Sequence, residues 1–454
     1  MKKLFLVGLP FLFLAAGALA QPLNEQRARK SPDWFRKSLT YQMMPRAMSG
    51  TGTLKGAGEQ LGRLSEMGVS LVYLLPINAA DTDMDRKNWS PRQIKSGFND
   101  PRNPYRAGDY FHLDPEYGTD QDLKDFVDKA HSLGMKVFLD LVFYHCGPSA
   151  QVIRQHPEYF QHDEEGNLKT GRWHFPIFDY SRRDTREYIK SIMCYYVADF
   201  NVDGFRLDVA DSIPLDFWDE ARAAVDALRP GTVLCAEGQK PENTLNAFDA
   251  NYSWPVCGPL TAGLDKFFKN GEEFDASTIR KSYEQYMSGA PRGTILWNYM
   301  ENHDTATDAF DERREKVWGY EASTLGLAII FALDGVPLIF TGQEACYDKR
   351  VSLFGHKDCW INWEEALSSD NARERVANIK HWADLRKNYS ALTDGEMVWL
   401  GNDQPKAVCS FVRRDGVSQD VVFIGNFSDK KVKVKLQDGS KYKLDPWGYV
   451  FEPR

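Results

Sequence analysis

The stretch that decides the fold is VDGFRLDVAD at residues 202–211, an apolar run that carries Arg206 and Asp208 two positions apart. Successive side chains of a β-strand alternate between its two faces, so both charges point the same way if this run is a strand. If that face lines a pocket, the guanidinium holds Asp208 as a carboxylate, which acts as an acceptor or nucleophile but not as an acid. An isolated Arg-x-Asp is more often a structural ion pair, so the rest of the chain has to decide between the two interpretations.

Similar apolar runs recur along the chain and alternate with helical patterns. Strands are expected at 39–45, 69–77, 135–145, 202–209, 232–238, 294–304 and 336–344, with a weaker one around 246–253. Helices with apolar residues three and four apart are expected between them, at 122–134, 186–201 and 216–231. This alternation predicts an α/β fold, a (β/α)8 or TIM barrel. A doubly wound open sheet is the main alternative, and it loses ground because no G-x-G-x-x-G follows the first strand.

The first twenty residues, MKKLFLVGLPFLFLAAGALA, combine two lysines, an apolar core and the small-residue ending Ala18-Leu19-Ala20. This pattern predicts a secretory signal peptide cleaved before Gln21, and an uncleaved membrane anchor is the alternative. We therefore expect an exported protein, periplasmic or extracellular, with no membrane span once the signal is removed.

The pattern changes after about residue 390, where short alternating segments are separated by turn residues. Such segments predict a small antiparallel β-sheet domain at the end of the chain. The expected organisation is a signal peptide at 1–20, a catalytic barrel at 21–387 and a C-terminal β domain at 388–454. The barrel is expected to include a short loop domain at about 146–180, after its third strand.

Composition excludes several classes of function. The formal net charge of −8 argues against nucleic acid as a partner. Seven scattered cysteines, none in C-x-x-C spacing, predict neither a zinc site nor a disulfide framework. An aromatic content of 13% suits a surface that stacks on sugar rings. No feature of the sequence specifies an oligomeric state.

Ionisable residues gather at the ends of the expected strands, where TIM barrels carry their chemistry. Burying one such group costs several kcal/mol unless it is paired, so a purely structural explanation needs a separate partner for each. Four strands ending this way predict a site. Its candidate residues are Asp140 and His145 after strand three, Arg206 and Asp208 after strand four, Glu237 after strand five, and Glu301, Asn302, His303 and Asp304 after strand seven.

Three carboxylates without metal-ligand spacing fit glycoside hydrolysis. A retaining mechanism needs a carboxylate nucleophile and a carboxylic acid about 5–5.5 Å apart. Asp208, paired with Arg206, is the natural ionised member, and Glu237 follows an apolar strand that favours its neutral form. Asp304 would bind sugar hydroxyls, with His145 and His303 donating hydrogen bonds to the same sugar.

Four short blocks, DLVFYH (140–145), GFRLDVAD (204–211), AEG (236–238) and ENHD (301–304), resemble in this order those of the α-amylase family of retaining glycoside hydrolases. The segments NPYRAGDYFHLDPEYGT (103–119) and LDPWGYVFE (444–452) are also similar to that family. The resemblance implies a barrel with a loop domain after strand three and a C-terminal β domain. It implies Asp208 as nucleophile, Glu237 as acid/base and Asp304 as the carboxylate that stabilises the transition state. It further implies that Arg206 orients the nucleophile and that Tyr105, Asp140, His145 and His303 shape the subsite of the cleaved sugar.

Two departures from the family pattern affect cofactor and substrate. Family members often have an Asn that helps to hold a structural calcium ion where this chain has Tyr144, and Tyr is a poor ligand for a hard cation. We therefore expect no cofactor and no calcium at the usual position. The acidic stretch 81–85 is read as a solvated loop, with a cation site elsewhere as the alternative. Residues 210–212, Ala-Asp-Ser, replace the Lys-His pair that contacts the next sugar in many family members. The sequence therefore does not specify the subsite on the product side or the preferred acceptor.

The leading hypothesis is an exported hydrolase that cleaves α-1,4-glucosidic bonds of starch or malto-oligosaccharides through a covalent glycosyl-enzyme. Transglycosylation or action on α-1,6 bonds by the same machinery is the first alternative. A non-catalytic glycan-binding protein is the second, since a fold does not guarantee a function. Six aromatic residues are candidate sugar platforms: Trp89, Trp173, Phe175, Trp254, Phe354 and Trp360.

Overall fold

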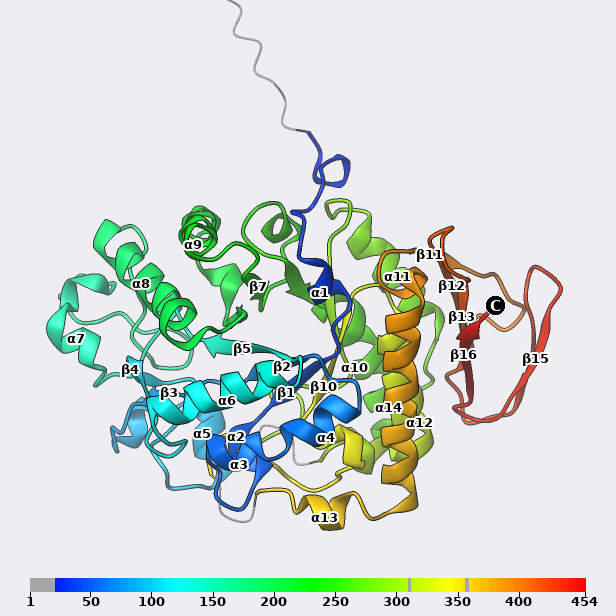
Figure 1. Ribbon diagram of the computed structural model, residues 1–454, viewed down its shortest axis with the longest axis horizontal. Coiled ribbons are helices and arrows are strands. Elements are labelled where there is room, and N and C mark those ends of the chain that lie inside the picture. Colours follow the sequence, from blue (N-terminus) through cyan, green and yellow to red (C-terminus); the bar gives the residue numbers. More distant parts are fainter. Residues whose placement is uncertain (1–20, 309–311, 356–358) are drawn as a thin grey trace, which may run out of the picture.

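Eight parallel strands close into a barrel in the computed structural model, which describes residues 21–308, 312–355 and 359–454 (Figure 1). The order around the barrel is β1-β10-β9-β8-β7-β6-β5-β2. The strands are β1 (Thr40–Met43), β2 (Leu71–Leu74), β5 (Lys136–Leu141), β6 (Gly204–Leu207), β7 (Val233–Ala236), β8 (Ala250–Tyr252), β9 (Leu296–Tyr299) and β10 (Val336–Phe340). The predicted (β/α)8 barrel is confirmed, including the weak strand around 246–253. The predicted signal peptide at 1–20 lies outside the described residues.

Every residue of these eight strands except Lys136 is buried, as strands packed on both faces should be. Neighbouring strands are in a register that pairs Asp140 of β5 with Arg206 of β6. Gly204 allows the close approach of the strands, because a Cβ there would lie 2.3 Å from the carbonyl oxygen of Val233. The register therefore brings the polar strand ends to one level.

Helices surround the barrel on its outer side (Figure 1). The longer ones are α6 (Asp120–Ser132), α8 (Arg183–Phe200), α9 (Leu215–Leu228), α10 (Trp254–Asn270), α11 (Ser277–Met287), α12 (Arg314–Ala332) and α14 (Asp370–Asn388). Short ones are α1 (Asp33–Arg36), α2 (Pro45–Met48), α3 (Leu54–Gly58), α4 (Leu61–Glu66), α5 (Pro91–Ser96), α7 (Gln151–Gln155) and α13 (Trp363–Ala366). Within the described ranges, no helix combines the length and apolarity needed to cross a membrane.

Two segments leave the C-terminal end of the barrel and pack together. The first, between β2 and α6, contains α5 and the antiparallel pair of β3 (Asn78–Ala80) and β4 (Ala107–Leu113), which the sequence did not predict. The second follows β5 and contains α7 and isolated bridges such as Phe160 with Phe178. The amide of Gly147 in the second segment donates to the carbonyl of Ala107 in the first, at 2.8 Å. The segment expected as a loop domain thus packs against β4.

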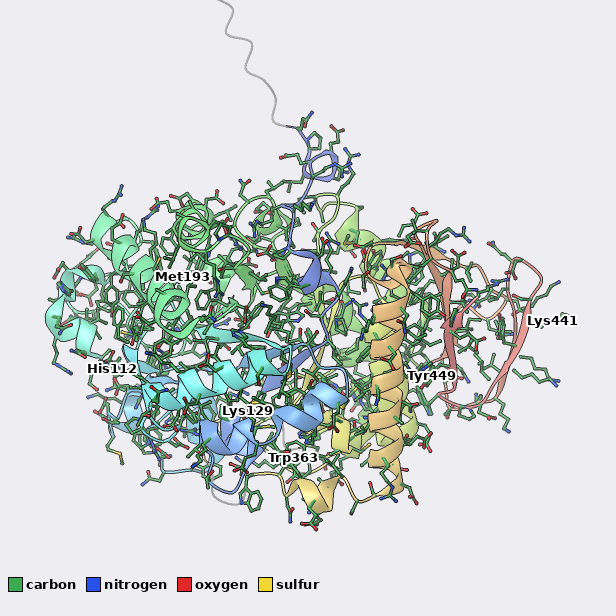
Figure 2. All side chains as sticks on the ribbon, viewed as in Figure 1. His112, Lys129, Met193, Trp363, Lys441 and Tyr449 are labelled. Carbon is green, nitrogen blue, oxygen red and sulfur yellow. The ribbon has the colours of Figure 1, made fainter. Side chains whose placement is uncertain are left out.

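The end of the chain forms a four-stranded antiparallel sheet in the order β11-β12-β13-β16. Its strands are β11 (Glu396–Trp399), β12 (Val408–Arg414), β13 (Val421–Asn426) and β16 (Tyr449–Pro453), and a separate hairpin joins β14 (Val432–Lys435) to β15 (Lys441–Leu444). The predicted C-terminal antiparallel sheet is confirmed. Phe411, Phe423 and Phe451 of this sheet belong to the same buried core as the barrel. Figure 2 shows Lys441 of the hairpin pointing away from the body of the molecule.

Candidate active site

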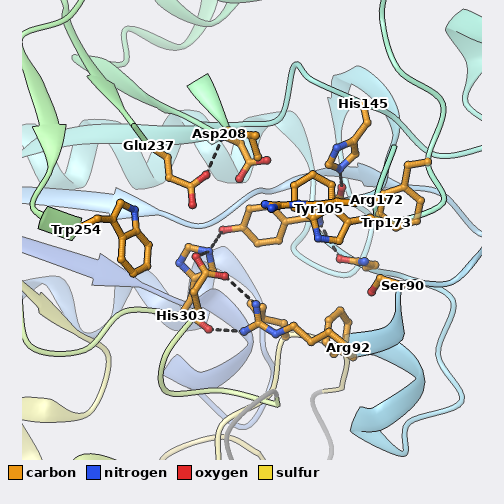
Figure 3. Close-up of a pocket in the computed structure, with 16 residues that line it drawn as sticks. Ser90, Arg92, Tyr105, His145, Arg172, Trp173, Asp208, Glu237, Trp254 and His303 are labelled. Atoms are coloured by element: carbon orange, nitrogen blue, oxygen red, sulfur yellow. Dashed lines mark hydrogen bonds and ion pairs between the residues drawn. The ribbon is translucent and has the colours of Figure 1, made fainter. Parts of the chain in front are cut away.

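A cavity of ≈ 320 Å³ opens at the C-terminal end of the barrel strands (Figure 3). The three predicted catalytic carboxylates, Asp208, Glu237 and Asp304, all line it. So do three of the five predicted substrate-binding residues, Tyr105, His145 and His303. The remaining lining residues are Ser90, Arg92, Asn103, Arg172, Trp173, Phe175, Val209, Trp254, Leu353 and Phe354.

Arg206 is the buried centre of the site. Its Nη1 donates 2.7 Å hydrogen bonds to Oδ1 of both Asp140 and Asp208. Its Nη2 forms an ion pair with Oε2 of Glu237 at 3.1 Å. One guanidinium therefore contacts three carboxyl groups at the ends of three adjacent strands. The sequence predicted only the pair that Arg206 forms with Asp208.

Asp140 lies beneath the cavity and does not line it. Its Oδ2 accepts hydrogen bonds from the hydroxyls of Tyr73 at 2.6 Å and Tyr105 at 2.8 Å, while its Oδ1 faces Arg206. The side chains of Asp140 and Arg206 are both fully buried. Asp140 and Arg206 therefore position Tyr105 and Asp208, which line the cavity. The lining residues are the ones placed to contact a sugar.

Val209 connects Asp208 and Glu237, the two predicted catalytic carboxylates: it follows Asp208 in the chain and its amide contacts Glu237. It follows Asp208 with φ +47 and ψ +38, in the left-handed region that a β-branched residue rarely adopts. This turn directs the Val209 amide to Oε2 of Glu237, where it donates a 2.7 Å hydrogen bond. The strained backbone thus positions Glu237 relative to Asp208.

One positive charge faces three carboxyl groups here, so the cluster retains protons. Burial raises the pKa of Glu237, and it raises the pKa of Asp208 as well, against the opposing effect of Arg206. Asp208 and Glu237 repel each other when both are ionised, so they titrate as a pair. Within the pair, the shorter Arg206 hydrogen bond favours the charge on Asp208. A charge on Asp208 and a proton on Glu237 is the arrangement that a nucleophile and an acid require.

Asp304 is held by a second arginine, Arg92, and not by a hydrogen bond to Arg206. Nη1 of Arg92 donates to Asp304 Oδ1 at 2.8 Å, and its Nη2 donates to the His303 carbonyl and the Thr307 hydroxyl, each at 2.5 Å. Burial raises the pKa of Asp304, but His303, Arg92 and Arg206 together outweigh burial and lower it to about 2. Since His303 is itself neutral near pH 7, the two arginines account for the effect there, and Asp304 is a carboxylate.

His303 takes part in a chain of hydrogen bonds that fixes its tautomer. Gln42 at the end of β1 accepts from the His303 amide at 3.1 Å, so its amide nitrogen is the group 2.8 Å from His303 Nδ1. Nδ1 is therefore the acceptor, and Nε2 donates to the Tyr105 hydroxyl at 2.7 Å. Tyr105 donates in turn to Asp140. Burial lowers the pKa of His303 to about 3, which keeps the chain in this order at neutral pH.

His145 also differs from the simple donor that was expected. Its Nε2 lies 2.9 Å from the Tyr105 carbonyl, which can only accept, so this nitrogen carries the proton. Burial lowers the pKa of His145 to about 4, so the ring is neutral and Nδ1 is a bare acceptor. The ring packs against Trp173 and Phe175, with centroids 5.2 and 5.0 Å away. His145 therefore has an acceptor atom, Nδ1, that is unpaired within the described part of the chain, where a donor was expected.

Sequence reasoning missed Gln42, Tyr73 and Arg92, and it did not name five further lining residues: Ser90, Asn103, Arg172, Val209 and Leu353. Gln42 and Tyr73 stand in the apolar strands β1 and β2, and searching all strands for polar groups would have found them. Arg92 lies in a long connection where nothing in the sequence places it beside Asp304. Conversely, Glu301 pairs with the buried Arg313 at 2.9 Å, and it is not part of the pocket lining.

The candidate sugar platforms divide into two groups. Trp173, Phe175, Trp254 and Phe354 line the pocket. Trp89 is fully buried, and Trp360 is 39% exposed but is not part of the lining. Four of the six aromatic residues are therefore placed to contact a ligand.

The residues at the position of the family's calcium site do not fit a calcium ion. Tyr144 packs its ring edge-on to Trp173, and a phenol is a poor ligand for Ca²⁺. In the acidic stretch, the Asp81 carboxylate already accepts from the Ser149 amide and hydroxyl, at 2.6 and 2.8 Å. Nη2 of Arg106 donates to the carbonyls of Asp81 and Asp83, at 3.0 and 2.9 Å. A guanidinium thus occupies the centre of this loop.

Comparisons with known proteins agree with this geometry. A model of the α-amylase catalytic domain matches residues 32–167 and 156–408. A cyclomaltodextrinase from Geobacillus thermopakistaniensis (strain MAS1) is 26% identical over 462 residues, covering 90% of this chain and 71% of that protein. An intracellular maltogenic amylase from Bacillus subtilis is 24% identical over 440 residues, covering 86% and 68%. The crystal structure of a maltogenic α-amylase from Thermotoga neapolitana shares 26% identity and a TM-score of 0.75, covering 92% of this chain and 97% of that one.

Proposed function

Because the chain belongs to the α-amylase family of glycoside hydrolases, we propose that it hydrolyses α-1,4-glucosidic bonds of starch or malto-oligosaccharides with retention at the anomeric carbon. One observation carries the proposal. Arg206 forms ion pairs with both Asp208 and Glu237, and these two residues share the pocket with an ionised Asp304. The names of the similar proteins, cyclomaltodextrinase and maltogenic amylase, support an α-glucan as the substrate class.

In the first step, the Asp208 carboxylate attacks the anomeric carbon of the bound sugar. The bond to the leaving oxygen breaks as Glu237 transfers its proton to that oxygen, and an ester forms between Asp208 and the sugar. Arg206 remains on Oδ1 of Asp208, which leaves Oδ2 as the attacking atom.

In the second step, Glu237 is a carboxylate and removes a proton from water. The water oxygen attacks the anomeric carbon, the ester to Asp208 breaks, and Glu237 regains its proton. Two inversions restore the α configuration. Asp304, ionised throughout, accepts hydrogen bonds from hydroxyls of the reacting sugar, and these strengthen as positive charge develops on the ring.

We also propose that the protein is exported, on the grounds of the signal-like residues 1–20. Two similar proteins, both from Bacillus subtilis, are named as intracellular, so this proposal rests on the chain's own first residues and not on its relatives. Mass spectrometry of the protein expressed from its full gene tests it. A mature form that begins at Gln21 is expected, and a cytoplasmic protein that retains residues 1–20 would contradict export.

Residues 21–454, incubated with maltoheptaose and with pullulan beside an Asp208→Asn control, test the activity. Chromatography follows the products, and NMR identifies the anomer formed first. Shorter α-anomeric malto-oligosaccharides from the wild type alone are expected. Products longer than the substrate would assign a transglycosylase, and α-1,6 cleavage of pullulan would assign the other linkage. Glucan binding without turnover would instead assign a binding protein.

A further inference from the structure

The barrel places two groups of loops on opposite sides of the pocket. Glu237 follows β7, and Trp254 follows β8. In the ring of eight strands, β1 lies opposite β7, with β2 and β10 as its two neighbours. The loops after β2 and β10 therefore face the side of the pocket away from Glu237.

The position of Glu237 sets the direction of a bound glucan, as a consequence of the proposed function. The acid must meet the leaving oxygen, so the sugars that leave lie on the side of Glu237. Sugars toward the non-reducing end extend the other way, into the loops after β2 and β10. The space left by these loops decides how many such sugars can bind.

The two loops are tied together by arginines. Arg350, in the loop after β10, donates to the Ser96 carbonyl at the end of α5, at 2.7 Å, and pairs with Asp308 at 2.6 Å. The ring of Phe98 packs against Gly355, where an added Cβ would lie 2.3 Å from it. The segment around α5 and residues 350–355 of the loop after β10 thus form one continuous wall.

A buried guanidinium fixes the base of the same wall. Arg46 of α2 donates to the Leu353 carbonyl in one loop and, at 3.2 Å, to the Arg102 carbonyl in the other. Glu116 holds this guanidinium at 2.7 Å. Because the side chain of Arg46 is only 3% exposed, separating the loops would leave a buried charge and its partners unsatisfied.

The inner face of the wall is packed and held in place. Leu353 and Phe354 are 1% and 2% exposed, and both line the pocket. Arg92, which lines the same pocket, is held by Asp304, His303 and Thr307. Asn103 completes the lining contributed by the segment after β2.

We infer that this wall closes the pocket beyond the cleaved sugar, so that the enzyme removes a glucose or maltose unit from the non-reducing end of an α-glucan. The inference deepens the proposed function and rests on it. An endo-acting enzyme needs a cleft open at both ends, whereas a wall at this position admits only a chain end.

A pair of nitrophenyl maltoheptaosides tests the inference, one with a free non-reducing end and one with that end blocked by an ethylidene acetal. The free substrate should be shortened from its non-reducing end, and the blocked one hydrolysed at least roughly 100-fold more slowly, because a chain end that clashes cannot bind. Similar rates on both substrates would show internal cleavage and overturn the inference, while leaving the hydrolase function intact. Turnover of neither would overturn the proposed function, and the inference with it.

Variants locate the wall. Arg350→Ala removes the tie to α5, and Phe354→Ala removes a lining ring without touching the tie. Both should raise the ratio of blocked to free hydrolysis, by about tenfold if one or two kcal/mol of steric exclusion is relieved. Arg280→Ala, which removes an exposed ion pair with Glu284 on α11, is the matched control and should leave the ratio unchanged. An unchanged ratio in both wall variants, with melting temperatures near that of the wild type, would overturn the assignment.

Discussion

Arg92 and Asp304 are 212 positions apart in the chain, and a 2.8 Å hydrogen bond from Nη1 to Oδ1 joins them across the mouth of the barrel. The bond connects the segment after β2 to the loop after β9. It also keeps a charged carboxylate, which must face a sugar, in one orientation. Arg92 is therefore a positioning residue for Asp304.

Arg92→Gln should lower kcat/KM by about 10- to 150-fold, the equivalent of a hydrogen bond to a charged group worth roughly 1.5–3 kcal/mol. The loss should fall mainly on kcat, because Asp304 interacts most strongly with the charged transition state. Arg86→Gln, in the same segment, is the control and should retain wild-type kinetics. Equal kinetics for Arg92→Gln and wild type would contradict the assigned position of Arg92.

Glu237→Gln should distinguish an acid from a merely structural carboxyl group. Hydrolysis of malto-oligosaccharides should fall by about 10²–10⁴-fold, the range for loss of a general acid. α-Glucosyl fluoride, whose leaving group needs little protonation, should be affected much less in its first step. Equal losses on both substrates would argue against Glu237 as the acid, and Glu284→Gln on the exposed face of α11 should change neither rate.

The sequence predicted the fold well because the signals for a barrel are local. Each strand is a short apolar run bounded by polar residues, and even the three-residue β8 was found from its place in the order. By contrast, β3 and β4 pair with an irregular register, and neither reads as an alternating strand. The four residues of β11 are half-buried at most, so their apolar pattern is weaker than that of the other strands of the same sheet.

The site was predictable to the extent that it lies at strand ends. Asp208, Glu237 and Asp304 were found in this way, and the structure brings all three to one cavity. The positions of Arg92 and Trp173 depend on how two long connections fold over the barrel, which no local pattern encodes. The tautomer of His145 depends on the Tyr105 carbonyl, a contact between distant segments that follows only from the packing.

Two buried neutral histidines should make the protein less stable in mild acid. Burial lowers the pKa of His145 to about 4 and that of His303 to about 3, against 6.5 in the unfolded chain. Below pH 6.5 the unfolded chain binds a proton at each histidine that the folded chain does not bind. Stability therefore falls with pH down to about pH 4, by up to about 1.4 kcal/mol per pH unit for each histidine.

Urea denaturation between about pH 7 and pH 5 measures this slope. His145→Gln should give a shallower slope than the wild type, because one of the two protons is no longer taken up on unfolding. His112→Gln, at an exposed histidine on β4, is the matched control and should retain the wild-type slope. A His145→Gln slope equal to the wild-type slope would show that His145 is not held neutral.

Chelation should leave stability unchanged, because Tyr144 replaces a calcium ligand and Arg106 occupies the centre of the acidic loop. The melting temperature should be the same with EDTA and with added Ca²⁺. Arg106→Met should lower the free energy of unfolding by roughly 2–5 kcal/mol, since it leaves several buried carbonyls unsatisfied. A large loss of melting temperature in EDTA that Ca²⁺ restores would contradict this account.

The central claim is that Asp208 forms a covalent bond to the sugar, and trapping that ester tests it most directly. The protein is incubated with a fluorinated α-glucosyl fluoride, which forms the ester faster than water can hydrolyse it, and its peptides are analysed by mass spectrometry. A single glycosyl adduct on the peptide that contains Asp208, absent from Asp208→Asn, is the predicted result. An adduct on another residue, or inactivation without any adduct, would contradict the mechanism.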